Sequence, residues 1–194
     1  MANMGNVMGL IFANMHDSAI HDLTKSRTMG SVPFGGRYRL IDFPLSNMVN
    51  SGMSEVGVIT KSNYQSLLDH LGSGREWDLS RKTGGLHLLP PFGHVGSGIY
   101  RGRLEALNNI IGFIEHSNAD HVIMCDSDVI TNMDFRPIVN AHKKSNADIT
   151  VVYAREHFTA DQTANKTIIN VNEDNRVIDV LTKPKMAGEL SASL

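Results

Sequence analysis

The segment S-V-P-F-G-G-R-Y-R-L-I-D-F-P-L-S-N-M-V-N-S-G, near the N-terminus, concentrates residue types that can do chemistry. Gly35–Gly36 permits backbone angles that side chains forbid. Arg37 and Arg39 lie beside this glycine pair, and Asp42 follows them among apolar residues. The two arginines and the aspartate could take part in catalysis, or they could form a structural network that holds the loop. We favour the network, with a role in folding or subunit contact.

A second candidate site lies at the polar end of the apolar run H-V-I-M-C-D, which ends at Asp126. Magnesium prefers carboxylate oxygens together with phosphates, so Asp128 is a candidate metal ligand and Asp126 a weaker one. The alternative is that Asp128 is a polar strand-end residue or caps the helix expected near Met133. Lys183, before a proline, could contact a ligand or could be simply exposed. The histidines do not form a set with metal-ligand spacing and are interpreted as solvated or satisfied; they include His16, His21, His87, His94 and His121.

These residues need elements to position them, and hydrophobic patterning predicts alternating strands and helices. The expected strands are Asn6–Phe12, Glu55–Thr60, His121–Asp126 (apolar throughout, as in a central parallel strand) and Ile149–Tyr153, followed by a hairpin of Thr167–Val171 and Val177–Leu181. The expected helices are one ending at Ser51 with Gly52 as its stop signal, Tyr64–Leu71, Leu104–Phe113 (with Leu104, Leu107, Ile111 and Ile114 on one face) and Phe135–Lys144. Gly72–Gly98 is expected to be a long loop, interrupted by the apolar Leu86–Leu89.

This alternation predicts an α/β domain of three layers with a mainly parallel sheet. In such sheets, ligands bind beyond the carboxyl ends of the strands. Three places meet that rule: the loop after Phe12, the segment Asp126–Asp128, and the loop from Gly98 to Leu104. We expect one domain over residues 1–194, with no second domain.

Composition narrows the functional class. The 194 residues carry a formal charge of −2, which does not mark a partner for nucleic acid or a membrane surface. No apolar run approaches the ~20 residues of a membrane span. Cys125 is the single cysteine and lies in an apolar run, so we expect a buried, inert thiol and a reducing, cytoplasmic setting. The C-terminal A-G-E-L-S-A-S-L shows no closing element, and the sequence is expected to be part of a longer chain.

The motifs resemble the glucose-1-phosphate adenylyltransferase family, whose members make ADP-glucose from ATP and glucose 1-phosphate with the help of Mg²⁺. The resemblance covers nearly the whole chain in order. It implies a Rossmann-like, three-layer nucleotide-diphospho-sugar transferase domain, followed in the family by a left-handed β-helix that is absent from these residues. The matching segments are Pro33–Gly52, Gly57–Thr60, Leu88–Pro90, Tyr100–Gly102, Asp128 and Lys183–Pro184.

The resemblance fails where the family has its catalytic loop. The family carries G-G-x-G-x-R before L-x-x-L-T, and anchoring on Leu23–Thr24 and Arg27 places this loop on N-M-H-D-S-A, residues 14–19. No glycine is present, Ala19 takes the place of the family's arginine, and Met29 takes the place of its lysine. In the nucleotide pocket, next to Gly102, an arginine replaces a small threonine. The residues that this alignment assigns to the nucleotide or sugar-phosphate pocket are Asn14, Met15, Gly102, Arg103, Asp128 and Lys183.

Physical chemistry gives the consequence of these changes. Phosphates need close backbone N–H groups and cations, whereas residues 14–19 crowd the approach and Asp17 adds a like charge. Losing one such donor costs ~10²–10³ in rate, and losing two would cost ~10⁴ or more. The pattern resembles the non-catalytic D-type subunit of the bacterial enzyme. It implies a regulatory partner of a catalytic C-type subunit, in a heterotetramer that could also bind a small-molecule effector.

Two other functions stay open on the sequence. The chain could be an active, Mg²⁺-dependent nucleotidyltransferase whose loop is rebuilt with cations from Lys25, Arg27 and Arg103. It could also be a stand-alone module that senses a sugar phosphate or a nucleotide. For Arg103 itself, filling the pocket or simple exposure is favoured over contact with an anionic effector.

Overall fold

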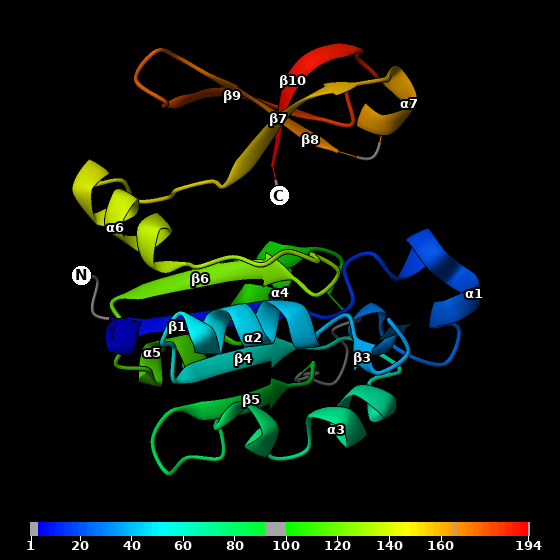
Figure 1. Ribbon diagram of the computed structural model, residues 1–194, viewed down its shortest axis with the longest axis vertical. Coiled ribbons are helices and arrows are strands. Elements are labelled where there is room, and N and C mark those ends of the chain that lie inside the picture. The colour runs from blue at the N-terminus through cyan, green and yellow to red at the C-terminus, as the bar shows by residue number, and fades with distance from the viewer. Residues whose placement is uncertain (1–3, 92–99, 165, 194) are drawn as a thin grey trace. The chain divides into compact units, whose positions relative to one another are not determined.

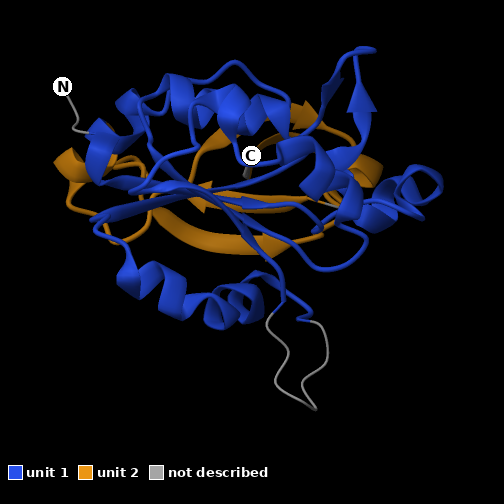
Figure 2. Ribbon diagram, turned by 90° about the horizontal axis from the view of Figure 1, so that it is seen from below, with its two compact units in different colours: residues 1–140 blue, residues 141–194 orange. Residues whose placement is uncertain are grey.

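The computed structural model describes residues 4–91, 100–164 and 166–193, and its chain divides into two compact units, residues 1–140 and 141–194 (Figure 2). Each unit has its own sheet. The single-domain expectation stays a prediction. Residues 92–99, which include His94 and Gly98 of the expected long loop, lie outside the described residues.

A parallel sheet of four strands organises unit 1. Its strands, in spatial order, are β5 (Gly85–Leu89), β4 (Glu55–Ile59), β1 (Val7–Phe12) and β6 (His121–Asp126) (Figure 1). The chain therefore moves outward from β1 to β4 and β5, and then returns to the other side of β1. This order confirms the expected α/β class with a parallel sheet.

Helices cover both faces of this sheet (Figure 1). On one face, Val7 and Ile11 of β1 join a core with α2 (Asp42–Asn50) and α3 (Gln65–Leu71). On the other face, alternate residues of β1 join a second core with α4 (Arg103–Asn109) and α5 (Ile111–His116). All six residues of β1 are buried, as a central strand of a three-layer fold requires.

A small hairpin carries the glycine pair of the N-terminal segment. Its strands are β2 (Pro33–Phe34) and β3 (Tyr38–Arg39), and the turn between them has φ of +61° at Gly35 and +77° at Gly36. Behind the turn, Arg39 donates to the carbonyl and hydroxyl oxygens of Ser66, and its backbone N–H donates to Asp42 over 3.0 Å. These contacts are of the kind expected from a structural network.

Unit 2 is built on an antiparallel sheet in the order β7 (Tyr153–Phe158), β10 (Gly188–Ser193), β8 (Thr167–Val171) and β9 (Val177–Thr182). The predicted hairpin is confirmed as β8 and β9. The short α7 (Ala160–Thr163) follows β7, and α6 (Arg136–Ser145) spans the boundary between the units. The small core of unit 2 contains Phe158, Ile168 and Ala192.

Three predictions for unit 1 were wrong in detail. Part of the expected long loop is strand β5, because Leu86–Leu89 pairs with β4. The expected helix Leu104–Phe113 is two helices that meet at Ile110, and Leu104 is 83% exposed instead of facing the core. Strand β6 lies at the sheet edge, and its Met124 is 52% exposed.

Two predictions for unit 2 were also wrong. Residues 149–152 do not form a strand; β7 begins at Tyr153, where pairing with β10 begins. The C-terminal segment, expected to lack a closing element, forms β10 between β7 and β8. In both cases the hydrogen-bonding partner lies far away in the sequence, so the local pattern does not reveal it.

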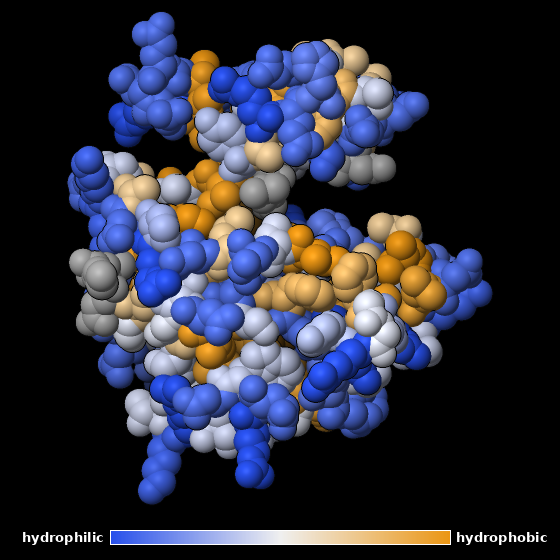
Figure 3. All heavy atoms as spheres, viewed as in Figure 1, coloured by the Kyte–Doolittle hydropathy of each residue, from blue (hydrophilic) through white to orange (hydrophobic). Residues whose placement is uncertain are grey.

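Short helical turns connect the larger elements. Between β1 and β2 lie a 3-10 turn (Asp17–Ile20), helix α1 (His21–Thr24) and a second 3-10 turn (Met29–Ser31); other 3-10 turns are Met4–Asn6 and Arg75–Trp77. Hydrophobic residues reach the surface around α1, where Leu23 is 57% exposed (Figure 3). Among the described residues, no helix has both the length and the apolar character needed to cross a bilayer.

Candidate functional site

The strand order places the candidate site at the carboxyl ends of β1 and β6. The chain leaves β1 for β4 on one side, whereas β6 adds to the other side of β1. This is the position where open α/β sheets bind ligands. Phe12 and Asp126 lie opposite each other in the pairing register, and the Ser127 N–H donates to the Phe12 carbonyl over 3.0 Å. The two strand ends and the loops that follow them are thus fixed side by side.

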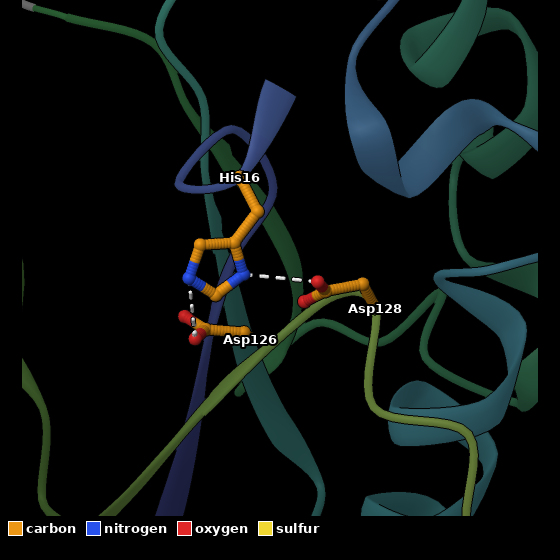
Figure 4. Close-up of side chains that lie close together, drawn as sticks. All are labelled: His16, Asp126 and Asp128. Carbon is orange, nitrogen blue, oxygen red and sulfur yellow. Dashed lines mark hydrogen bonds and ion pairs between the residues drawn. The ribbon is translucent and has the colours of Figure 1, made fainter. Parts of the chain in front are cut away.

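Three titratable side chains meet at this edge (Figure 4). His16 comes from the loop after β1. Asp126 is the last residue of β6, and Asp128 lies two residues after it. The Nδ1 atom of His16 lies 2.9 Å from Oδ2 of Asp128, and its Nε2 atom lies 3.8 Å from Oδ2 of Asp126. Since each imidazole nitrogen faces a carboxylate, the ring sits between the two acids. The sequence pattern placed Asp128 and Asp126 here but missed His16.

Arg103 adds a second cationic side chain from the first turn of α4. Its guanidinium pairs with Oδ2 of Asp126 and lies over the Phe12 ring, 5.8 Å from the ring centroid. Arginine on an aromatic face gains a cation–π interaction in addition to the ion pair. The guanidinium is therefore paired within the protein, although 52% of the side chain stays exposed.

The loop after β1 is closed by its own hydrogen bonds. Asn14 is buried, and its amide nitrogen donates to Oδ2 of Asp17 over 2.6 Å and to the Ser62 carbonyl over 3.2 Å. Its amide oxygen accepts from the Lys61 N–H over 2.8 Å. Asn14 therefore joins the end of β1 to the loop after β4, and both polar atoms of its side chain are hydrogen-bonded within the protein.

The Asp17 carboxylate occupies the neighbouring backbone donor. Its Oδ1 atom accepts the Met29 N–H over 2.8 Å, and its backbone carbonyl accepts the Thr24 hydroxyl over 2.6 Å. A carboxylate bound to a backbone N–H is the same kind of contact that an anionic ligand would make. The chain thus supplies an anion of its own at the place where the resemblance puts phosphate.

The positions of the family's two catalytic cations hold no substitute. Met29 is 4% exposed and packs with Val32, Leu40 and Ile20 in an apolar cluster. Ala19 is exposed, and its N–H donates to the His16 carbonyl over 2.9 Å. A thioether in an apolar cluster and a methyl group cannot stabilise developing negative charge.

The remaining predicted pocket residues are divided between the units. Met15 packs against the core that includes α4, and Gly102 caps the start of α4 with open space where a Cβ would lie. Lys183 belongs to unit 2, has φ of +53°, and donates its N–H to the Lys166 carbonyl over 2.9 Å. The structure thus brings Asn14, Arg103 and Asp128 to one edge of unit 1, and the ligand contact proposed for Lys183 stays a prediction.

Electrostatics at this edge follow from the same contacts. The hydrogen bond to Asp128 raises the pKa of His16 above its ordinary value of 6.5, against the opposing effect of burial. Burial disfavours the charged form of Asp128, but the hydrogen bond and charge of His16 outweigh it, so the pKa of Asp128 is lowered. Burial, with the nearby Asp126 and Asp128, raises the pKa of the Cys125 thiol to about 12. The thiol therefore stays protonated near neutral pH. Cys125 is partly exposed, so the expectation of a buried cysteine was wrong, and its inert role stays a prediction.

We expect the His16–Asp128 pair to make protein stability depend on pH. The raised pKa of His16 means that its contribution is complete below about pH 6.5 and is lost as pH rises through the folded-state pKa. The lowered pKa of Asp128 means that its contribution is present above about pH 3.8 and is lost as pH falls through the folded-state pKa. The pair thus stabilises most between these values, by about 1 kcal/mol or less because His16 is half exposed.

Urea unfolding of wild type and His16→Asn between pH 5 and 9 measures this contribution. The wild-type advantage should be largest near pH 6 and should shrink towards pH 9. His21→Asn, at an exposed histidine of α1, is the matched control for replacing a surface histidine by asparagine. A His16→Asn difference that is constant with pH would contradict the prediction.

Comparison with known proteins places these features in context. Residues 11–192 match the family described as Nucleotidyl transferase. A glucose-1-phosphate adenylyltransferase from Pseudothermotoga lettingae is 37% identical over 191 residues, which is 98% of this chain and 45% of that protein. Another from Clostridium perfringens is 35% identical over 189 residues, covering 97% of this chain and 48% of that protein. The chain thus spans about half the length of these relatives.

The fold is also found in a solved structure at lower sequence similarity. A crystal structure of a Bacillus anthracis protein named as a glucose-1-phosphate thymidylyltransferase, in complex with sucrose, aligns with a TM-score of 0.73 at 19% identity. The alignment covers 96% of this chain and 68% of that one. At this identity the likeness supports the fold and carries no statement about substrate.

Proposed function

This chain belongs to the nucleotidyl transferase family, and from that premise we propose that it forms part of a regulatory subunit of a glucose-1-phosphate adenylyltransferase. The subunit is deficient in catalysis and acts through a catalytic partner. Its family reaction joins ATP and glucose 1-phosphate to give ADP-glucose and pyrophosphate. The relatives named for this reaction, at about 35% identity over nearly the whole chain, support the choice of reaction.

The observation that carries the proposal is the closed loop after β1. Nucleotidyl transfer needs backbone donors and cations at the phosphates, because negative charge develops there. Here the Asp17 carboxylate accepts a hydrogen bond from the Met29 N–H. The Asn14 amide nitrogen donates to Asp17, and its amide oxygen accepts from the Lys61 N–H. The Met29 side chain is buried in an apolar cluster. A polyphosphate would have to displace the protein's own carboxylate and would still find no lysine or arginine at the two family positions.

A role beside a catalytic subunit is compatible with the ordered contacts in the rest of the domain. The hairpin with Arg39 and Asp42 keeps its internal contacts although the loop cannot serve phosphate. We propose that the chain assembles with a catalytic C-type subunit, as a heterotetramer, and modulates its turnover or its response to a small-molecule effector.

The test is to mix the full-length protein with the catalytic subunit from the same organism. ADP-glucose formation is followed for the catalytic subunit alone, for the mixture, and for a mixture with an unrelated protein as control. Size-exclusion chromatography with light scattering follows assembly. A change in turnover or effector response, together with a mixed oligomer, is the expected result. Two proteins that neither associate nor alter each other's kinetics would overturn the proposal.

A further inference from the structure

The two carboxylates at the end of β6 raise the question of which cation neutralises them. The resemblance to the family implies that an active member would hold Mg²⁺ at the position of Asp128. Magnesium takes oxygen ligands in a nearly octahedral arrangement and retains waters, so it needs accessible carboxylate oxygens and room around them. In this chain, Oδ2 of Asp128 faces the His16 imidazole and Oδ2 of Asp126 faces the Arg103 guanidinium. One ligand atom from each of His16, Asp126 and Asp128 lies within 4.8 Å of the others, so the group is compact enough for an ion. One of the three ligands would be a histidine nitrogen, which is not the oxygen that Mg²⁺ prefers, and the Arg103 guanidinium already pairs with Asp126.

We propose that His16 and Arg103 are internal substitutes for a divalent cation, so that this site holds no Mg²⁺ in the folded protein. The inference rests on the geometry of the β6 carboxylates and does not require the regulatory role proposed above.

The origin of the two side chains supports this inference. His16 comes from the loop after β1, and Arg103 comes from α4, so two separate segments converge on β6 (Figure 4 shows His16 between the acids). Arg103 is fixed further by the Phe12 ring beneath it. A metal ion would have to approach a permanent positive charge, because the guanidinium cannot lose its proton at any ordinary pH.

The second carboxylate oxygen of Asp126 does not provide an alternative ligand for a metal ion. Its Oδ1 atom is buried and has no hydrogen-bond partner among the described residues. A cation cannot reach a buried oxygen unless a neighbouring side chain moves, and Arg103 and His16 are the neighbours paired with this carboxylate. Removing both should therefore uncover two carboxylates within reach of one ion, as a Mg²⁺ or Mn²⁺ site requires.

Binding of Mn²⁺, measured by electron paramagnetic resonance on the full-length protein without nucleotide, tests the inference. Wild type should bind no more Mn²⁺ than Asp128→Asn does. The double variant His16→Ala with Arg103→Ala should bind Mn²⁺ at least about tenfold more tightly than wild type, because one permanent positive charge has been removed from beside the carboxylates. Adding Asp128→Asn to the double variant should abolish the gain.

Arg101→Ala is the matched control, since Arg101 is exposed and pairs with Glu105, away from the β6 acids. It should leave Mn²⁺ binding unchanged. Saturable Mn²⁺ binding by wild type that Asp128→Asn removes would overturn the inference, even if the double variant fails to fold. A folded double variant, shown by circular dichroism, that gains no Mn²⁺ site would also overturn it.

These outcomes are separable from those of the proposed function. A wild-type protein that binds no Mn²⁺ but does not act on a catalytic subunit would remove the regulatory role and leave the inference intact. A protein that regulates its partner and also binds Mn²⁺ through Asp128 would do the reverse.

Discussion

Assayed alone, the full-length protein is expected to form ADP-glucose about 10⁴-fold or more slowly than an active relative. One well-placed electrostatic donor contributes about 10²–10³ in rate, and this chain has Ala19 and Met29 at two family cation positions. Closure of the loop by Asn14 and Asp17 adds to the loss, since the backbone donor at Met29 is already used. The measurement is ADP-glucose formation from ATP, glucose 1-phosphate and excess Mg²⁺.

The Pseudothermotoga lettingae relative, 37% identical, is the positive control for this assay. Turnover by the full-length protein within tenfold of that control would contradict the prediction. In that case a rebuilt loop would have to supply cations from Lys25, Arg27 or Arg103. Two of these are already paired, Lys25 with Asp22 at 3.2 Å and Arg103 with Asp126, so such a loop would have to rearrange before it could act.

A rescue experiment separates the missing lysine from the closed loop. Met29→Lys places an amine in the apolar cluster of Val32 and Leu40, so it should lower the free energy of unfolding by about 1–3 kcal/mol and should not restore activity. Met29→Leu is the matched control and should cost about 1.5 kcal/mol or less, since the volume is conserved. Substantial activity in Met29→Lys would show that the closed loop is no barrier to phosphate.

The sequence was sufficient for elements that carry a complete local signal. Strand β1, strand β4 and helix α3 were predicted within about a residue or two, because each has its own hydrophobic period and a bounding turn residue. Elements whose pairing partner is distant were missed. Strand β10 contains a glycine, two serines and a glutamate, and becomes a strand because β7 and β8 offer hydrogen bonds on both sides.

The candidate site shows the same division. The rule for the carboxyl ends of parallel strands selected the loop after Phe12 and the segment after β6, and the structure brings these two segments together. It did not select His16, which lies 112 residues from Asp128 and has no metal-like spacing to any other histidine. Because β1 and β6 are neighbours, every polar residue after β1 is a possible partner for every polar residue after β6. The same consideration applies to Asp17: the sequence showed a like charge near phosphate, whereas the structure shows it bound to the Met29 N–H.

Gly57 of β4 lies in the parallel sheet that brings these loops together, and replacing it with a larger residue should change the stability of the protein. A Cβ added there would lie 2.8 Å from Leu10 Cδ2 and Leu89 Cδ1, and 3.1 Å from Phe113 Cε1. Overpacking a core of this kind costs about 1–3 kcal/mol, against a gain of roughly 0.5–1 kcal/mol from replacing glycine in a strand. We therefore expect Gly57→Ala to lower the free energy of unfolding by about 1–2 kcal/mol, measured by urea denaturation.

Gly112 of α5 is the matched control, because an added Cβ there meets nothing within 4 Å. Gly112→Ala should raise the free energy of unfolding by up to about 1 kcal/mol, since alanine restricts the unfolded chain and favours the helix. The two substitutions add the same methyl group to unit 1. Opposite signs would therefore reflect what each methyl group meets, together with the helix preference of alanine at Gly112. Equal stability of the two variants would mean that the α5 side of the sheet is packed more loosely than the positions of Leu10, Leu89 and Phe113 require.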